Sequence, residues 1–372
     1  MMSKRFIITI VTLVVIAVVA GIAIFLAKGY TFSAKEKRIV GTGIITISSE
    51  PDAASVFIDG HLTTATNATV SSLPSKTYSV KLTKEGFIPW EKSVAVKEGL
   101  VTEIKVTLFP SLPSIYPLTF SGVAAPVLSP DGSKLSFIVP SGPVGLGVNK
   151  KAGVWVWTMV KNQPIAFARS AEPHQIATNQ TADFSKATLR WSADSKQVLA
   201  TLANSNYLLE FDQMNSDPKD ITPILDATLS SWEEDTSSKD EARVLSIKDV
   251  KLRKIASDSA IVRWAPDETK MMVSNEKEKL NFRVYDLEEN KDYPLPSAKA
   301  HLWLPDSRHI TMVEKNTISI LDFDGTNKAV IYAGNFLDNF VFPWPDSSRL
   351  VIISSFPTPT ASEPNLYGIN LR

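Results

Sequence analysis

The sequence of 372 residues contains no cysteine, which excludes disulfides, thiolate metal sites and cysteine nucleophiles. Histidine is scarce as well, which leaves little imidazole for covalent catalysis. The four histidines are His61, His174, His301 and His309. Neither sign of charge is in excess, since 39 basic and 39 acidic side chains give a formal net charge of zero. A nucleic-acid-binding protein usually carries a basic excess that displaces counterions, so we expect no nucleic-acid partner.

Short motifs that would mark an enzyme are also missing. The chain has no Gly-x-Ser-x-Gly nucleophile elbow and no His-Glu-x-x-His zinc motif. The Gly-rich stretch 145–151 lacks the spacing of a phosphate loop, and we interpret it as a loop. Asp322–Gly325 lacks the distal ligands of a calcium loop, which favours a hairpin turn. His301 and His309 flank one turn, where we expect a surface pair that is an incomplete zinc site. The sequence predicts no catalytic residue, no metal and no cofactor.

The first long feature of the chain is an apolar run. Phe6–Ala27 contains no charged residue, and about 20 such residues span the hydrocarbon core of a bilayer as a helix. A cleaved signal peptide is the alternative, but its apolar region is normally about 7–15 residues long. We therefore predict that residues 1–5 form a short tail, that 6–27 cross the membrane in contact with lipid, and that 28–40 are a linker.

The orientation of this predicted span rests on its position in the chain. Lys4 and Arg5 precede the run, and four basic residues lie between 28 and 38, so the positive-inside rule mildly favours a body inside the cell. Against that, a five-residue tail before a single early span is the usual arrangement of a signal anchor that exports the rest of the chain. We expect a single-pass protein of the cell membrane with an extracytoplasmic body.

Residues 41–110 have the period-two pattern of β-strands. Apolar and polar side chains alternate at 45–48, 78–82 and 104–108, so each strand buries one face. Asp59-Gly60 follows an apolar run and is a hairpin signal. We predict a small β-sandwich over 41–110, with Asp59 and Gly60 as structural turn residues.

These residues resemble the PEGA domain, a β-sandwich module of envelope proteins. The matching motifs are Ser49-Glu50-Pro51, Ala54–Gly60, Leu73-Pro74, Tyr78-Ser79-Val80 and Glu85-Gly86-Phe87 with Trp90. The sequence departs from the family pattern at Ser75 and at Asn67-Ala68, both in expected loops. The resemblance implies a surface or periplasmic structural module and implies no catalysis.

One short block recurs five times after residue 113, each copy followed by an apolar strand. The copies are Leu128–Leu135, Trp191–Val198, Trp264–Met271, Trp303–Ile310 and Pro343–Leu350. Their aspartates are Asp131, Asp194, Asp267, Asp306 and Asp346. An aspartate in a tight turn accepts hydrogen bonds from backbone amides two residues on. Because the residue recurs in every copy, we interpret these aspartates as structural turn residues and not as catalytic or metal-binding carboxylates.

The spacing of the block predicts a β-propeller over residues 113–372. The last two intervals between the aspartates are 39 and 40 residues, close to one four-stranded blade of about 40–45 residues. The blocks resemble the Trp-Ser-Pro-Asp-Gly repeats of TolB-like propellers. We expect a mainly β chain with five blades, or six if one has lost its signature. Ser114–Thr119 or Leu366–Leu371 would close the ring by pairing the first and last blades.

Two longer intervals require insertions. One is the Gly-rich loop Ser141–Ala152, and the other is 229–256, which we predict to be a helical hairpin on the propeller. Capping-box patterns at Ser231…Glu234 and Ser238…Glu241 indicate helix starts. The apolar residues expected on one helical face are Leu245, Leu252, Ile255 and Ala256. The many charges of the hairpin fit either a solvated face or a docking surface.

We expect a non-catalytic, membrane-tethered binding or scaffolding protein of a prokaryotic envelope, with a propeller that contacts a protein or an envelope glycan. One alternative is an enzyme that acts on a glycan or peptide in the central funnel. The other is a sensor or assembly factor whose helical insertion docks a membrane complex, which an apolar patch on the insertion would favour. We also expect that deletion of Ser231–Lys254 reduces partner contact while the propeller still folds.

Overall fold

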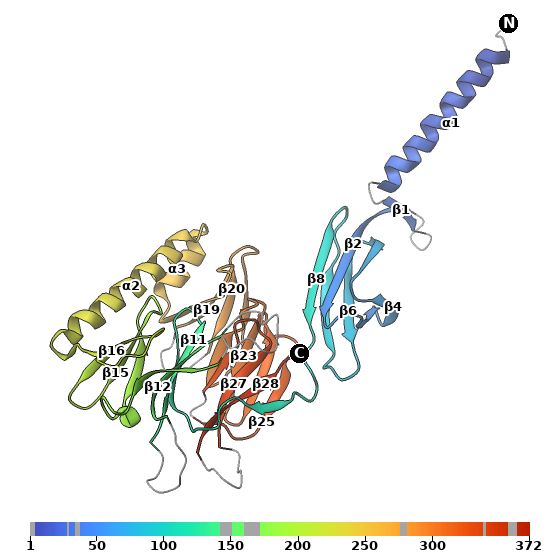
Figure 1. Ribbon diagram of the computed structural model, residues 1–372. Helices are drawn as coiled ribbons and strands as arrows, with labels where there is room; N and C mark the ends of the chain where they lie inside the picture. The colour runs from blue at the N-terminus through green and yellow to red at the C-terminus, as the bar shows by residue number, and fades with distance from the viewer. Residues whose placement is uncertain are drawn as a thin grey trace. The chain divides into compact units, whose positions relative to one another are not determined.

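The computed structural model describes residues 4–27, 30–33, 38–141, 151–159, 172–275, 281–337, 340–355 and 363–372 (Figure 1). The chain divides into two compact units. The first is Met1–Leu112 together with Arg372, and the second is Pro113–Leu371.

The first unit begins with helix α1 (Lys4–Ala27). Its side chains are described from Ile8 to Ile24, and each of them is exposed. Within the described part of the chain, no helix has the length and apolarity needed to cross a membrane.

The rest of the first unit is a sandwich of two four-stranded sheets. One sheet contains β1 (Tyr30–Ser33), β2 (Arg38–Glu50), β5 (Ala68–Pro74) and β8 (Val101–Thr107). The other contains β4 (His61–Ala65), β3 (Ser55–Ile58), β6 (Thr77–Thr83) and β7 (Trp90–Ala95). Neighbouring strands are antiparallel, except that β2 and β8 run parallel.

The period-two pattern of the sequence forms the core between these sheets. Ile45 and Ile47 of β2 pack in one cluster with Tyr78, Val80 and Leu82 of β6, all of them buried. Intervening residues of β6 lie on the outer face. Burial of one face from each sheet is what stabilises a module of this size.

The second unit contains five four-stranded antiparallel sheets, which we number as blades in chain order. Blade 1 is β10 (Ala124–Leu128), β11 (Lys134–Val139), β12 (Gly153–Thr158) and β13 (His174–Thr178). Blade 2 is β14 (Thr188–Trp191), β15 (Gln197–Thr201), β16 (Asn206–Glu210) and β17 (Lys219–Asp220). Blade 3 is β18 (Ile261–Trp264), β19 (Lys270–Ser274), β20 (Arg283–Asp286) and β21 (Lys291–Pro294). Blade 4 is β22 (Ala300–Trp303), β23 (His309–Val313), β24 (Thr317–Asp322) and β25 (Ala329–Ala333).

Blade 5 joins the two ends of the second unit. It contains β26 (Val341–Pro343), β27 (Arg349–Ser354) and β28 (Asn365–Asn370), and its fourth strand is β9 (Ile115–Pro117). The two segments expected to close the ring therefore pair with each other, with Ile115 opposite Ile369. Every described strand of this unit belongs to one of the five blades, so the architecture is a five-bladed propeller.

Buried side chains join neighbouring blades. One cluster combines blade 1 with blade 2, a second combines blade 1 with blade 5, and a third combines blade 3 with blade 4. Tryptophans contribute to these contacts: Trp344 of the fifth repeat copy meets Trp157 of β12 edge to face, with ring centroids 5.3 Å apart.

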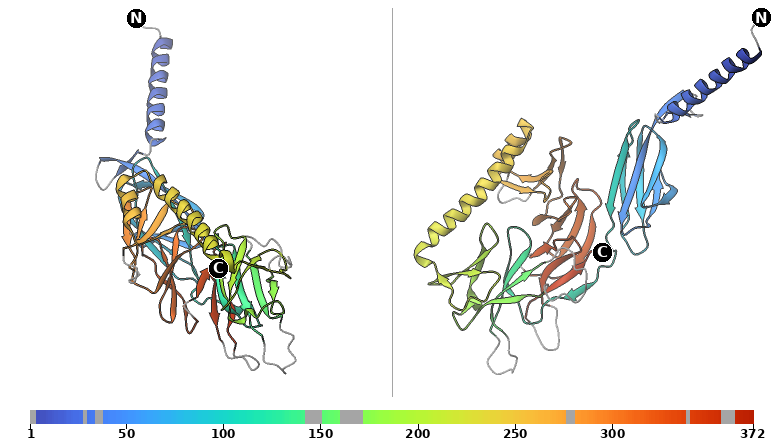
Figure 2. Two further views of the ribbon diagram at one scale, coloured as in Figure 1. Left: turned by 90° about the vertical axis from the view of Figure 1, so that its left-hand side faces the viewer. Right: turned by 45° about the horizontal axis from the view of Figure 1, so that its top comes forward.

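The insertion between blades 2 and 3 forms two helices, α2 (Leu225–Ser246) and α3 (Val250–Asp258), which lie beside these blades (Figure 2). The helical hairpin is confirmed, but both capping-box predictions are wrong, because Ser231 and Ser238 lie inside α2. The chain enters α2 directly from a short 3-10 helix, so α2 begins without a side-chain cap. The capping side chain is Asp249, which accepts hydrogen bonds from the amides of Lys251 and Leu252 at the start of α3.

Candidate functional site

The five repeated turns join the first and second strands of each blade. In every copy a carboxylate oxygen of the aspartate accepts a hydrogen bond from the backbone amide two residues on, at 2.8–3.1 Å. The donors are Ser133, Lys196, Thr269, Arg308 and Ser348. This geometry orients each aspartate toward its own turn.

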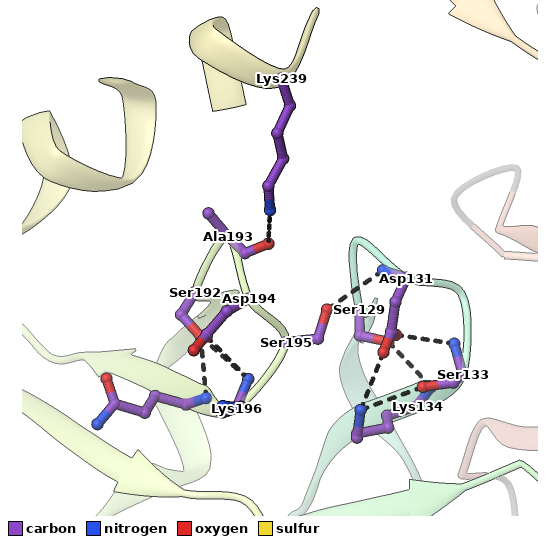
Figure 3. Close-up of polar contacts among 11 residues, drawn as sticks. Ser129, Asp131, Ser133, Lys134, Ser192, Ala193, Asp194, Ser195, Lys196 and Lys239 are labelled. Carbon is purple, nitrogen blue, oxygen red and sulfur yellow. Dashed lines mark hydrogen bonds and ion pairs between the residues drawn. The ribbon is translucent and has the colours of Figure 1, made fainter. Parts of the chain in front are cut away.

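The turns of blades 1 and 2 carry further donors (Figure 3). Asp131 also accepts from Ser129 Oγ at 2.5 Å and from Lys134 Nζ at 3.0 Å. Asp194 also accepts from Ser192 Oγ at 2.7 Å. These carboxylates are occupied within their turns, which leaves little free capacity for a metal or a substrate.

The same contacts keep the carboxylates ionised. Burial raises the pKa of Asp131, but the hydrogen bonds from Ser129, Ser133 and Lys134 outweigh it and leave the pKa lowered. The hydrogen bond from Ser192 lowers the pKa of Asp194. A general acid needs the opposite shift, so the electrostatics of these two sites favour a structural carboxylate.

Blade 4 departs from this plan through a histidine. His309 Nδ1 lies 2.6 Å from Asp306 Oδ2, and His309 Nε2 lies 3.6 Å from Asp322 Oδ1. His309 is 4% exposed and His301 is 0% exposed, so the prediction of a surface pair is wrong. His301 lies on β22, where its Nε2 is 2.9 Å from the Pro296 carbonyl oxygen. The two histidines therefore belong to separate networks and form no shared metal site.

Serines after the turn aspartates link consecutive blades, a role that the sequence patterns did not predict. Ser195 Oγ of blade 2 accepts from the amide of Asp131 in blade 1, at 3.2 Å (Figure 3). Ser307 Oγ of blade 4 accepts in the same way from the amide of Asp267 in blade 3, at 3.0 Å. The only sequence signal is that the position after the aspartate is small and polar in several copies.

Tryptophan side chains provide a second link between the same blades. Trp191 Nε1 donates to the Val127 carbonyl oxygen at 2.9 Å, from blade 2 to blade 1. Trp303 Nε1 donates to the Arg263 carbonyl oxygen at 3.0 Å, from blade 4 to blade 3. The repeat thus carries both an apolar ring and a fixed hydrogen bond across each of these junctions.

At the junction of blades 2 and 3, helix α2 contacts the repeated turns. Lys239 Nζ donates to the Ala193 carbonyl oxygen of the blade 2 turn at 3.4 Å (Figure 3). Arg243 Nε donates to Glu268 Oε1 of the blade 3 turn at 2.8 Å. Glu268 occupies the position that holds Ser195 and Ser307 in the neighbouring turns. The helix therefore bridges two adjacent turns of the propeller.

Helix α3 packs into the apolar core of blade 3. Leu252 and Ala256 are buried in one cluster with Met271 and Val273 of β19. Leu245, which was expected on the same apolar face, is instead 61% exposed at the end of α2. The insertion is therefore part of the folded propeller on one side and exposed on the other.

The exposed side of the insertion ends in an apolar tip. We use that term for Leu245 and Val250, which flank the turn between α2 and α3 and are 61% and 75% exposed. Helix α2 contains no buried residue, although its contacts with blades 2 and 3 hold it in place. Leu245 and Val250 are therefore exposed apolar side chains on an element that the propeller holds in place.

The remaining predicted residues lie apart from this region or outside the described residues. Asp59 and Gly60 form the turn between β3 and β4 with φ of 48° and 81°. Asp59 accepts from the Ser79 amide at 3.0 Å and from Lys76 Nζ at 2.6 Å. The turn at Asp322–Gly325 joins β24 and β25 as expected. Most of the loop Ser141–Ala152, with the Gly-rich stretch, lies outside the described residues.

Among the described side chains, no group of three or more histidine, aspartate or glutamate residues is arranged to hold a metal ion. The contacts above instead gather at the insertion, where two turns, two helices and an exposed tip meet. We take this region as the candidate functional site.

Comparisons with known proteins agree with the two-unit architecture. The PEGA domain family matches residues 42–112. The N-terminal unit thus contains a PEGA domain, and a five-bladed β-propeller follows it. No curated protein matches the sequence.

Solved structures give weak similarities. A putative TolB from Agrobacterium tumefaciens is 13% identical, covers 69% of this chain and 89% of its own, and has a TM-score of 0.25. TolB from Acinetobacter baumannii is 12% identical with the same TM-score, and covers 80% of this chain and 60% of its own. The β-propeller domain of the Trilobed protease from Pyrococcus furiosus is 13% identical, with a TM-score of 0.23. The match covers 69% of this chain and 72% of that domain. These similarities are too weak to indicate an activity for this protein.

Proposed function

We propose that this protein is a membrane-tethered, non-catalytic binding protein of the cell envelope. In this proposal α1 is the anchor, the PEGA domain is a spacer, and the propeller presents the helical insertion to a protein partner. The observation that carries the binding role is the apolar tip at Leu245 and Val250, held by bonds from α2 to two propeller turns.

The anchor is supported by the composition of α1. Phe6–Ala27 has no charged side chain, and the described side chains of the helix are all exposed in the isolated chain. Exposure of Ile, Val and Leu around the whole helix is unfavourable in water, whereas lipid solvates all faces of such a helix. A body outside the cytoplasmic membrane agrees with the occurrence of PEGA domains in envelope proteins.

Binding without catalysis is supported by how the repeated carboxylates are used. Asp131 and Asp194 accept several hydrogen bonds within their own turns and have lowered pKa values. They are therefore satisfied as structural acceptors. Loops and insertions on a rigid scaffold are where binding residues concentrate, which favours the helical insertion.

A variant of the tip tests this function. In the double variant Leu245→Asp/Val250→Asp, two charges would be buried in the proposed interface, so a partner recovered from membranes with the wild type should be lost. Val330→Asp is the matched control, since Val330 is 48% exposed on β25 of blade 4. Equal recovery of the same partner by both variants would place the interface elsewhere. Turnover of a glycan or peptide library by the purified protein would refute the non-catalytic role.

A further inference from the structure

A cavity lies between helix α3 and the adjoining ends of β19 and β20 in blade 3. Its volume is about 400 Å³, within the ~300–1,000 Å³ range of small-molecule sites. The lining includes three basic residues, one acidic residue, and polar and apolar side chains. The basic residues are Lys251, Lys254 and Arg283, of which Arg283 is paired with Asp292, and the acidic residue is Asp258. Residues 276–280, between the two strands, lie outside the described part and are not counted in the site.

The basic wall of the cavity belongs to α3. Lys251 and Lys254 lie one turn apart and line the cavity, whereas Leu252 and Ala256 pack into blade 3. Within the described part of the chain, no ion pair joins Lys251 or Lys254 to a carboxylate. Two unpaired cations one helical turn apart attract an anionic group such as a carboxylate.

The remaining walls offer the chemistry of hydroxyl recognition. Asn275 and Asn281 present amides, which both donate to and accept from hydroxyl groups. Asp258 lines the cavity four residues after Lys254, about 6 Å along the helix, and its carboxylate can accept hydrogen bonds from hydroxyl groups. Tyr285 and Ile255 add an aromatic and an aliphatic surface for an apolar ring face.

We propose that this cavity binds an acidic sugar unit of a glycan. The carboxylate of the sugar would lie against Lys251 and Lys254, its hydroxyl groups against the asparagines, and its ring against Tyr285. A neutral sugar would leave both ammonium groups unpaired, and a simple inorganic anion would use none of the hydroxyl partners. This inference goes beyond the proposed protein-binding role, because it adds a glycan site whose lining does not include the residues of the apolar tip.

The test uses the full-length protein in detergent and four probes. These are a tetrasaccharide of alternating glucuronic acid and N-acetylglucosamine, neutral chitotetraose, glucuronic acid and inorganic phosphate. Calorimetry or ligand-observed NMR measures each affinity at low and at physiological salt. We expect the acidic tetrasaccharide to bind about tenfold or more tightly than the neutral one, a difference of ~1.4 kcal/mol. Higher salt should weaken the binding of the acidic tetrasaccharide and leave the affinity for chitotetraose unchanged.

Matched lysine variants locate the site. Lys251→Gln/Lys254→Gln should weaken binding of the acidic tetrasaccharide about tenfold or more, while Lys248→Gln should not, because Lys248 is not among the residues that line the cavity. The proposal would be overturned if the acidic tetrasaccharide did not bind, or if chitotetraose or phosphate bound with equal affinity. An equal loss of affinity in Lys248→Gln would overturn it as well. Recovery of a protein partner through the apolar tip does not depend on these outcomes. The glycan-binding proposal can therefore fail while the proposed protein-binding function holds, and the reverse is also true.

Discussion

His309 Nδ1 lies 2.6 Å from Asp306 Oδ2, and only 5% and 17% of the two side chains are exposed. Burial raises the pKa of Asp306, but the hydrogen bond and the charge of His309 outweigh it and leave the pKa lowered. At the same repeat position the other blades have Lys134, Gln197, Lys270 and Arg349. Blade 4 is therefore the copy in which the turn carboxylate is paired with a buried imidazole.

This pair predicts a pH-dependent contribution to stability. A carboxylate with a lowered native pKa stabilises the fold above its unfolded pKa of about 3.9, and this contribution is lost as the pH falls through the native value. We expect Asp306→Asn to lower the free energy of unfolding by about 1–3 kcal/mol at pH 7, and by progressively less below pH ~4. Chemical denaturation at pH 7 and pH 3 measures both values. Asp267→Asn is the control in a turn without histidine, and a pH-independent difference for Asp306→Asn would contradict the prediction.

The turn aspartates are expected to act in stability and not in activity. Replacement of Asp131 with Ala removes an acceptor for Ser129, Ser133 and Lys134, and should cost about 1–3 kcal/mol. Asp131→Asn is the matched control, because its amide oxygen can still accept the hydrogen bonds from Ser129 and Ser133, and only the ion pair with Lys134 is lost. Denaturant unfolding measures the difference. An Asp131→Ala protein of wild-type stability that had lost partner binding would contradict this role.

The sequence predicts the strands and the turns well because their determinants are local. Period-two patterns indicate the sandwich strands, and a repeated turn block indicates the five blades. Contacts between distant segments were not predictable: the bond from the Asp131 amide to Ser195 joins residues 64 positions apart. The same limit applies to His309, which is buried and lies 3.6 Å from Asp322 at the end of the next strand.

The candidate site was predicted in part. The sequence predicted the helical hairpin correctly, but the capping pattern at Ser231 lies inside α2. A four-residue motif contains no information about where the preceding blade ends, so it could not give the start of the helix. The cavity depends on how α3 packs against Met271 and Val273. Only that packing places Lys251 and Lys254 on one wall, and the sequence alone indicates no more than a charged surface there.

The N-terminal helix predicts an intact N-terminus on the membrane-bound protein. Phe6–Ala27 exceeds the apolar region of a signal peptide, so we expect no cleavage. Mass spectrometry of the protein purified from membranes should find the original N-terminal residues. A mature chain that starts between Ala23 and Lys28 would show that the segment is a cleaved signal.

An extracytoplasmic body predicts sensitivity to external protease. When protease is added to intact cells whose outer barriers have been opened, the PEGA domain and the propeller should be degraded, while a cytoplasmic marker survives. Protection of the body together with the marker would reverse the proposed topology.

Two leucines of the insertion differ in burial, which allows its role in stability and its role in binding to be tested separately. Leu252 of α3 is 7% exposed against blade 3, and Leu245 at the end of α2 is 61% exposed. Leu252→Ala should lower the free energy of unfolding by about 2–5 kcal/mol, since it leaves a cavity in the core. Leu245→Ala should change it by no more than about 0.5 kcal/mol while weakening partner binding.

This packing also revises the deletion expected from the sequence. Removal of Ser231–Lys254 takes away Leu252 and exposes Met271 and Val273, so the propeller should be destabilised and not merely shortened. Denaturant unfolding and hydrogen exchange of β19 measure the effect, with Leu245→Ala as the control that leaves the core intact. If the deleted protein keeps wild-type stability and protection of β19, α3 is not a core element of blade 3. In that case the insertion is an independent arm, and deletion becomes a valid test of partner binding.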